Sequence, residues 1–364
     1  MNNIENILTS YDTVILFVYL IACYLMISFT IKNALKLKLI DTPNERASHL
    51  IPTPSSGGIV LVLTLPIILL YQFNFTIEIL IISMFIIGLI GFIDDRIDLS
   101  PKIKFLSQIA IASALFYSDV KIDNLYGFIG IYQLPSLLSY LVTIVLIVGI
   151  INAYNLIDGI NGLLGSISLI NIILFLFIFQ SINQSILIIT LIIGLFLISF
   201  LRFNIGNAKI FMGDTGSLPL GVFFSFLFIT MFNENNTGNS SALFMILFPC
   251  LDMVRLFASR VKNKKSPFKA DKNHYHHLLL KFKNNHLLAT FICLILQVVI
   301  FSISYITYVN KSFFQAVIIT LAVSSLIFVV AEVLLATRNK NDLKLNEKEL
   351  SKLNKNKRLL INNK

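Results

Sequence analysis

The chain has 364 residues, of which 56% are hydrophobic and only 13% are charged, and its formal net charge is +10. A soluble domain of this size carries about twice that fraction of charged residues. The composition therefore excludes both a soluble enzyme and a disordered protein. Because charge is expensive inside a bilayer, we expect the basic excess to lie outside the apolar segments.

Eleven segments approach the roughly 20 mostly apolar residues that a membrane-spanning helix needs. We therefore expect an all-α, polytopic membrane helix bundle that forms a single domain over residues 1–336, followed by a basic tail over residues 337–364. This tail is interpreted either as a helix on the membrane surface or as a disordered segment. The apolar segments are 12–31, 57–73, 76–93, 103–119, 134–151, 163–180, 185–201, 216–232, 241–258, 287–309 and 313–336.

The basic residues predict how these segments are oriented. If the N-terminus lies outside, all of the 29 Lys and Arg residues except Lys121 and Lys311 fall in cytoplasmic loops or in the tail. The positive-inside rule thus predicts an N-out, C-in topology with an odd number of spans. The three cysteines lie within apolar spans without CxxC spacing, so we interpret them as packing residues rather than as disulfide partners.

Five polar clusters fall on the predicted cytoplasmic side, where loops more often carry function than helices do. The first is Asp-Thr-Pro-Asn-Glu-Arg-Ala-Ser-His over residues 41–49, which includes Arg46 and His49. A Pro/Gly-rich turn with solvated charges explains this segment equally well.

The second cluster begins with two adjacent carboxylates, Asp94 and Asp95, at the end of the third apolar segment. Such a pair repels itself and is costly to desolvate, so it favours a divalent cation, a cationic neighbour or a proton. The alternative is a solvated helix end whose charges are paired with Arg96, Lys102 or Lys104.

The third cluster is Asn-Ala-Tyr-Asn-Leu-Ile-Asp-Gly-Ile-Asn-Gly over residues 152–162. If its start is helical, Asn152, Asn155 and Asp158 share one face. The cluster then presents two amides and a carboxylate together. Its glycines, Gly159 and Gly162, permit tight turns or the close approach of a ligand.

The fourth cluster, residues 211–217, directly precedes the eighth apolar segment. We expect Thr215 and Ser217 to cap this helix, so that its first N–H groups face a bound anion. Asp214 is then either a cap or a cation ligand, and a hard cation such as Mg²⁺ prefers one or two carboxylates together with phosphate oxygens.

The fifth cluster places three imidazoles, His274, His276 and His277, in the most basic loop. No Cys or HExxH motif accompanies them, so they are interpreted as phosphate donors rather than as zinc ligands. Asp252 lies near the inner end of the ninth segment, where we interpret it as an interfacial charge that pairs with Arg255 at i+3.

Taken together, acidic and amide groups suited to Mg²⁺ and basic groups suited to phosphates gather on one face. This combination is typical of phosphoryl transfer, in which catalysis is mainly positioning and charge stabilisation. Because a bilayer encloses the chain, we expect one of the phosphate-bearing substrates to be a lipid.

Over residues 41–277, the five clusters resemble, in order and spacing, the motifs of the polyprenyl-phosphate N-acetylhexosamine-1-phosphate transferases, glycosyltransferase family 4. Within this family, the Asp-Lys-Asn-His-Tyr-His-His string resembles the branch that uses undecaprenyl phosphate and UDP-GlcNAc. The resemblance implies attack of polyprenyl phosphate on the β-phosphorus of a UDP-N-acetylhexosamine, with release of UMP. One departure is Ser55, where an Arg commonly follows the second Pro of the first motif.

The resemblance also implies a role for each matching residue. Asp214 and Asn155 would hold Mg²⁺, with Mn²⁺ as an alternative. Asp94 and Asp95 match the catalytic pair, and Asp94 would deprotonate or orient the lipid phosphate. The three histidines would join catalysis by contacting the diphosphate or the sugar. The remaining residues are expected to bind substrate: Asp158, Asn161, Asn152, Arg46, His49 and Lys102.

The implied partners are a UDP-N-acetylhexosamine, a polyprenyl phosphate and the membrane, without nucleic acid, and a homodimer is compatible with the resemblance. The implied location is the bacterial plasma membrane with cytoplasmic catalytic loops, at the first membrane step of a cell-envelope polysaccharide.

Two other functions stay open at the level of the sequence. An intramembrane prenyltransferase also uses Asp-rich Mg²⁺ motifs, but it would need a second DDxxD-like box, which this chain lacks. A nucleotide-sugar transporter would place charged or polar residues at mid-membrane on several spans, whereas the carboxylates here gather at one interface.

Overall fold

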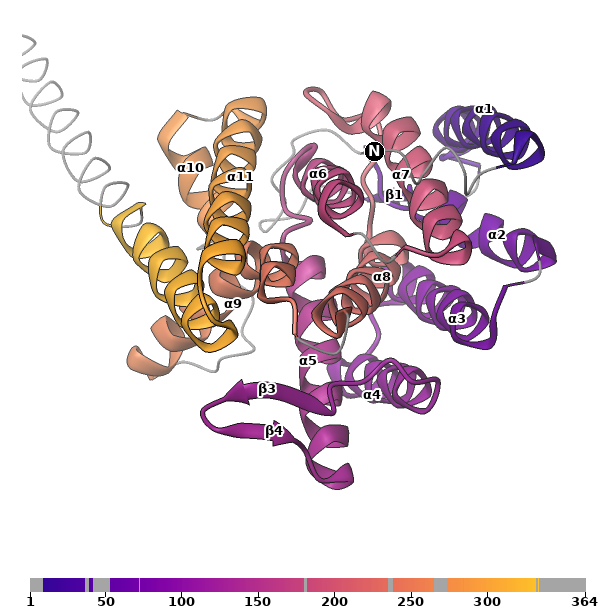
Figure 1. Ribbon diagram of the computed structural model, residues 1–364. Coiled ribbons are helices and arrows are strands. Elements are labelled where there is room, and N and C mark those ends of the chain that lie inside the picture. Colours follow the sequence, from indigo (N-terminus) through magenta and orange to yellow (C-terminus); the bar gives the residue numbers. More distant parts are fainter. Residues whose placement is uncertain are drawn as a thin grey trace, which may run out of the picture.

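The computed structural model describes residues 9–36, 39–41, 53–71, 73–179, 182–234, 238–264, 274–283, 285–331 and 333. Within the described residues, each of the eleven predicted apolar segments contains a helix, and a short additional helix, α10, follows the ninth (Figure 1). The helices are α1 (Ser10–Asn33), α2 (Ile59–Ile68), α3 (Phe75–Ile97), α4 (Pro101–Tyr117), α5 (Ser136–Leu156), α6 (Leu163–Ile178), α7 (Gln184–Asn204), α8 (Asp214–Phe232), α9 (Phe244–Lys262), α10 (Tyr275–Lys283), α11 (His286–Asn310) and an unlabelled last helix, Phe313–Ala331; short 3₁₀ turns, η1 (Leu69–Tyr71) and η3 (Ser240–Leu243), follow α2 and precede α9.

Within the described residues, eight helices are long and apolar enough to cross a bilayer. They are α1, α3, α5, α7, α8, η3 with α9, α11 and the last helix. The three other predicted spans, α2, α4 and α6, have 10, 17 and 16 residues. The chain is therefore a multi-pass membrane protein, and the number of eleven crossings stays a prediction.

Helix α8 forms the centre of the bundle, where it packs between α3 and α5 (Figure 1). Nearly all of its side chains are buried. Close packing depends on glycines, since a Cβ atom on Gly221 of α8 would lie 2.6 Å from the Cα atom of Ile151 in α5. A Cβ atom on Gly88 of α3 would likewise lie 2.4 Å from Val62 of α2.

A proline inside α9 exposes a carbonyl that other helices then use. Pro249 has no N–H to donate to the carbonyl of Met245, four residues earlier. That carbonyl instead accepts hydrogen bonds from the Tyr154 hydroxyl of α5, at 2.9 Å, and from Asn171 Nδ2 of α6, at 3.3 Å. Gln297 of α11 donates to the Asn171 side chain and, at 2.9 Å, to the carbonyl of Phe244. These buried amides therefore join four helices around the proline.

Two small antiparallel strand pairs interrupt the helical pattern. Strands β1 (Ile40–Asp41) and β2 (Thr53–Pro54) pair with each other ahead of α2. Strands β3 (Asn124–Phe128) and β4 (Ile131–Gln133) form a hairpin between α4 and α5, which the apolar pattern did not predict. The hairpin packs through Tyr126, whose ring lies 5.6 Å from that of Phe232 in α8.

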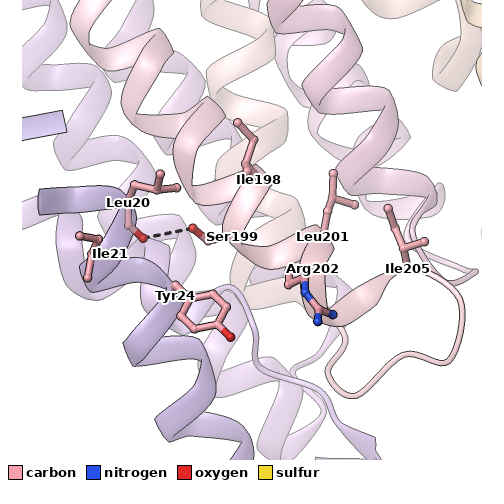
Figure 2. Close-up of a pocket in the computed structure, with 8 residues that line it drawn as sticks. All are labelled: Leu20, Ile21, Tyr24, Ile198, Ser199, Leu201, Arg202 and Ile205. Carbon is pink, nitrogen blue, oxygen red and sulfur yellow. Dashed lines mark hydrogen bonds between the residues drawn. The ribbon is translucent and has the colours of Figure 1, made fainter. Parts of the chain in front are cut away.

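A cavity of about 750 Å³ opens between α1 and α7 (Figure 2). Its lining is apolar apart from Arg202, Ser199 and the Tyr24 hydroxyl, and Ser199 bonds to the carbonyl of Leu20. It contains no residue of the polar clusters, so it is a side groove of the bundle rather than the site that the motifs predict. The lining residues are Leu20, Ile21, Tyr24, Ile198, Ser199, Leu201, Arg202 and Ile205.

Replacement of Asn171 by Ala should lower the thermal stability of the protein in detergent. It removes the groups that bond to Tyr154, Met245 and Gln297, and interhelical hydrogen bonds in membranes contribute about 0.6 kcal/mol on average and up to about 1.7 kcal/mol. The Tm of Asn171→Ala, measured by thermal unfolding, is expected to fall by several degrees. Ser302→Ala is the control, because Ser302 is half-buried and its hydroxyl donates to the carbonyl of Val298 within the same helix. Equal Tm values for the two variants would contradict the view that the hydrogen bonds around Pro249 hold the four helices together.

Candidate active site

Four helix ends bring one charged cluster together. Asp94 lies in the last turn of α3, Lys104 in the first turn of α4, Asn155 at the end of α5 and Asp214 at the start of α8. Lys104 Nζ lies 2.9 Å from Asp94 Oδ2 and 3.2 Å from Asp214 Oδ2. Asn155 Nδ2 donates to Asp214 Oδ1 at 2.7 Å. Two carboxylates from different motifs therefore converge on one cationic position.

Glycines allow this convergence, because backbone touches backbone at the start of α8. A Cβ atom on Gly91 of α3 would lie 2.3 Å from the carbonyl oxygen of Asp214. A Cβ atom on Gly58 would lie 2.2 Å from the backbone of Gly216. No larger residue fits at either position without moving Asp214 away from α3.

The segment that follows the first motif, residues 54–58, forms backbone hydrogen bonds with the fourth motif. The backbone N–H of Gly57 donates to the carbonyl of Phe211 at 2.7 Å, and that of Gly58 donates to Met212 at 3.0 Å. The N–H of Phe211 in turn donates to the carbonyl of Pro54 at 2.7 Å. The end of β2 and the turn that follows it thus fix the loop that leads into α8.

The carboxylate of Asp95, a residue of α3, caps the N-terminus of α8. Its Oδ1 accepts the backbone N–H of Asp214 at 2.9 Å, and its Oδ2 accepts the N–H and the hydroxyl of Thr215 at 3.1 and 2.6 Å. The expectation that Thr215 and Ser217 cap the helix was wrong, since the cap residue is Gly213 and no side chain of α8 caps its own end. The anion that faces these N–H groups is Asp95 itself, supplied by α3.

Asp158 lies in the loop after α5 and approaches the same helix start. Its Oδ2 accepts the N–H of Gly213 at 3.2 Å. Burial raises the pKa of the Asp158 carboxyl to about 7, and the negative charges of Asp214 and Asp95 act in the same direction. Asp158 is thus close to Asp95 and Asp214, but it lies beyond the end of α5 and so not on a helix face shared with Asn152 and Asn155.

The side chain of Asn152, one turn before Asn155, is engaged by α4. Its Nδ2 donates to Gln108 Oε1 at 2.7 Å, and Gln108 Nε2 donates back to Asn152 Oδ1 at 3.3 Å. The structure therefore places Asn152 against a neighbouring amide beside the cluster.

Asn161 bridges the loop after α5 to the loop after α7 and to α11. Its Nδ2 donates to the carbonyl of Gly206 at 2.6 Å, and its own carbonyl accepts the hydroxyl of Thr290 at 2.9 Å. Its Oδ1 is buried and has no hydrogen-bond partner in the described part of the chain. One acceptor of this side chain is thus left over for another group.

The histidines lie against the third motif. A Cβ atom on Gly159 would lie 2.4 Å from His276 Nε2 and 3.2 Å from His277 Nε2, so only a glycine fits there. The rings of His274 and His276 stack with centroids 5.5 Å apart. His276 is buried, which lowers the pKa of its imidazole well below the usual value, and its Nε2 has no hydrogen-bond partner among the described residues.

Among the described residues, Lys102 is a predicted site residue that does not join this cluster. Arg46 and His49 lie outside the described residues. Lys102 is exposed in the first turn of α4. Lys104, which the sequence suggested only as one candidate partner of the carboxylates, is the residue that reaches them. The sequence places Lys104 on the same face of α4 as Gln108 at i+4, but only the structure, in which Gln108 is buried, shows that this face points inward.

The donor groups fit a magnesium ion. Among the described residues, no group of three or more His, Cys, Asp or Glu side chains is arranged to hold a metal. Asp94 and Asp214, however, direct two carboxylates at the position of one ammonium group. Mg²⁺ is commonly bound by one or two carboxylates together with waters and substrate phosphates, so the donor set matches that ion.

Comparison with known proteins gives the same assignment as the motifs. The family model described as Glycosyl transferase family 4 matches residues 77–232, which include the carboxylate cluster. The chain is 34% identical over 282 residues to the Undecaprenyl-phosphate alpha-N-acetylglucosaminyl 1-phosphate transferase of Pasteurella multocida, over 73% of this chain and 78% of the relative.

More distant relatives cover a similar or larger share. A Probable undecaprenyl-phosphate N-acetylglucosaminyl 1-phosphate transferase of Bacillus subtilis is 29% identical over 88% of this chain and 91% of the relative. A Decaprenyl-phosphate N-acetylglucosaminephosphotransferase of Mycobacterium leprae is 28% identical over 69% of this chain and 72% of the relative. With its motifs, its membrane helices and these similarities, the chain belongs to glycosyl transferase family 4.

Proposed function

We propose that this enzyme transfers N-acetylglucosamine 1-phosphate from UDP-GlcNAc to undecaprenyl phosphate or a related polyprenyl phosphate and releases UMP. A phosphate oxygen of the lipid forms the new bond to the β-phosphorus, and the bond from that phosphorus to the bridging oxygen of UMP breaks. The names of the relatives support this acceptor and this sugar. The observation that carries the proposal is the convergence of Asp94 and Asp214 on one cationic position.

Asp94 is proposed to act on the lipid phosphate. Its Oδ1 accepts the backbone N–H of Leu99 at 2.8 Å, and its Oδ2 is held by Lys104, so the carboxylate has a fixed orientation. In this position it can deprotonate or orient the attacking phosphate. Asp95 would complete the catalytic pair by holding the first turn of α8, and with it Asp214, in place.

Asp214 and Asn155 are proposed to hold Mg²⁺, with Mn²⁺ as an alternative. When bound, the ion would neutralise charge on the diphosphate. The two residues already contact each other, and Asn155 Nδ2 also lies 2.8 Å from Ser217 Oγ, so the amide has a fixed position beside the carboxylate.

The remaining predicted residues are proposed to bind the donor. His276 and Asn161 each have a buried polar atom without a partner in the described residues, and both are close to the glycine-rich turn after α5. A diphosphate or a sugar hydroxyl can satisfy such atoms. His274 and His277 would act with His276, and Asp158 with Asn161. Additional proposed contacts, which no feature of the described chain tests, are Asn152, Arg46, His49 and Lys102.

The site is proposed to face the cytoplasm of a bacterial cell, at the plasma membrane, where the product would begin a cell-envelope polysaccharide. The distribution of Lys and Arg residues supports this orientation. A homodimer, a surface position of the basic tail over residues 337–364 and the absence of a nucleic-acid partner belong to the same proposal.

Asp214→Asn and Asp94→Asn should each reduce UMP release at least about 100-fold, since removal of one preorganised charged group from such a site has effects of this size. The measurement uses the purified protein with UDP-GlcNAc, polyprenyl phosphate and Mg²⁺. The control is Asp119→Asn, because Asp119 pairs with Lys121 at the opposite end of the bundle. Turnover close to that of the wild type in either site variant would refute the assignment.

Lys104→Met should make the protein bind Mg²⁺ more tightly. Without the ammonium group, Asp94 and Asp214 lose the cation that now separates them, so a divalent ion gains by replacing it. We expect a lower Tm without metal, and half of the Mg²⁺-induced rise in Tm at an about tenfold lower concentration, equivalent to about 1.4 kcal/mol. Lys121→Met removes a lysine that is paired at the same distance elsewhere and should leave the Mg²⁺ response unchanged. A response of Lys104→Met equal to that of the wild type would contradict the shared cation position.

The proposed orientation can be tested with two single cysteines. Asp119 and Lys264 are exposed and lie at opposite ends of the bundle. A membrane-impermeant maleimide should label Asp119→Cys in intact spheroplasts, and Lys264→Cys only after permeabilisation. The reverse pattern would place the candidate site outside the cell and contradict the topology.

A further inference from the structure

Asp252 of α9 is more deeply placed than an interfacial charge. Asp252 is only 1% exposed, so the interpretation as an interfacial charge was wrong. The expected pair with Arg255 is present, with Arg255 Nη2 at 2.9 Å and Nε at 3.2 Å from Asp252 Oδ1. Both bonds from Arg255 go to Oδ1, so Oδ2 is left for another partner. The other contacts of the Asp252 carboxylate are with the histidine motif.

Both oxygens of Asp252 bind the start of α10. Oδ1 accepts the backbone N–H of Tyr275, the first residue of that helix, at 3.0 Å. Oδ2 lies 3.0 Å from Nδ1 of His274. The first N–H groups of a helix have no partner within the helix and favour a negative charge. Asp252 therefore determines where α10 begins and which way His274 turns.

The orientation of His274 is transmitted to the other histidines. Because Nδ1 is engaged by Asp252, only Nε2 of His274 is available to a ligand. Its ring stacks on His276 with an interplanar angle of 14°, and the rings of His276 and His277 lie 4.4 Å apart. His276 in turn contacts Gly159. A continuous set of contacts thus runs from the α9 carboxylate to the turn that carries Asp158.

We propose that Asp252 is a positioning residue for donor binding, which holds His274 so that Nε2 is presented to the diphosphate of UDP-GlcNAc. The inference rests on the proposed function, in which the histidines contact that diphosphate. The carboxylate also compensates the positive charge of an imidazolium when His274 donates to an anion. Asp252 acts through His274 and does not itself touch the substrate.

A carboxylate is required at this position because both of its oxygens act as acceptors. The side-chain amide of an asparagine has one acceptor oxygen and one donor nitrogen. If the oxygen of an Asn at position 252 faces Arg255 and Tyr275, its nitrogen points a donor at Nδ1 of His274. That ring nitrogen can then no longer carry a proton itself. If the oxygen faces His274, the nitrogen opposes the guanidinium. Either arrangement disturbs the ring or leaves a buried donor without a partner.

The test is steady-state kinetics of the full-length enzyme with UDP-GlcNAc and polyprenyl phosphate as the varied substrates. Asp252→Asn and His274→Asn should each raise the KM for UDP-GlcNAc about tenfold or more and leave the KM for polyprenyl phosphate unchanged. The double variant should be no worse than His274→Asn alone, because Asp252 acts only through that ring. Asp252→Glu, which keeps the charge and both acceptors, should fold and recover part of the donor affinity.

Asp12→Asn is the matched control. Asp12 is also a buried carboxylate, which accepts bonds from Tyr71, Thr9 and Gln184 near the start of α1. The Asp12→Asn substitution should lower the Tm without changing the KM for either substrate, as expected of a purely structural carboxylate.

The outcomes separate the inference from the function on which it rests. If His274→Asn raises the KM for UDP-GlcNAc while Asp252→Asn does not, the inference is overturned and the proposed function stands. Multiplicative effects in the double variant would also overturn it, because Asp252 would then act independently of His274. An unchanged KM in His274→Asn would contradict both the role of the histidines and the inference.

Discussion

The contact between the Asp95 carboxylate and the first N–H groups of α8 is the constraint on which the site depends. A helix start buried in the bundle leaves N–H groups that neither water nor the helix itself can satisfy. Because α3 supplies the acceptor, the first turn of α8 is tied to the last turn of α3. The glycine contacts around Gly91 and Gly216 then remove the remaining freedom. Asp214 is therefore held beside Asp94 by main-chain bonds, even though two like charges at this distance repel each other, and Lys104 offsets that repulsion.

The same physical arrangement occurs a second time, at α10. Asp252 of α9 accepts the first N–H of α10 as Asp95 accepts those of α8, and in both cases the capped helix start carries residues of the candidate site. A buried carboxylate is costly unless it is paired and hydrogen-bonded. At a helix N-terminus it meets donors that need an acceptor, so the two unfavourable terms offset each other. The chain thus uses two carboxylates, the half-buried Asp95 and the buried Asp252, to position other reactive groups.

The sequence predicts the helices well because long apolar runs are a local property, and every predicted segment contains a helix in its described residues. It also predicts that Asp94, Asn155, Asp158 and Asp214 belong together, since their motifs follow the third and fifth segments and precede the eighth, all on the predicted cytoplasmic side. It does not choose between Lys102 and Lys104, because that choice depends on the rotation of α4 about its axis. The bond from Asp252 to His274 spans two elements and leaves no pattern in the sequence. The hairpin β3–β4 is also missed, since its residues neither alternate cleanly nor carry a two-residue turn signal.

The polar groups in the middle of the bundle differ in kind from those at the site. Tyr154, Asn171 and Gln297 are neutral, and their hydrogen bonds close on one another and on the carbonyl groups of Phe244 and Met245. A transport path requires polar groups that a substrate can reach at mid-membrane, whereas these groups hold the proline-interrupted part of α9 against α5, α6 and α11. Asp252 lies three residues after that proline, on the part of α9 that these hydrogen bonds orient. The buried network therefore supports chemistry at one end of the bundle: it fixes the direction of α9, and α9 fixes the histidines.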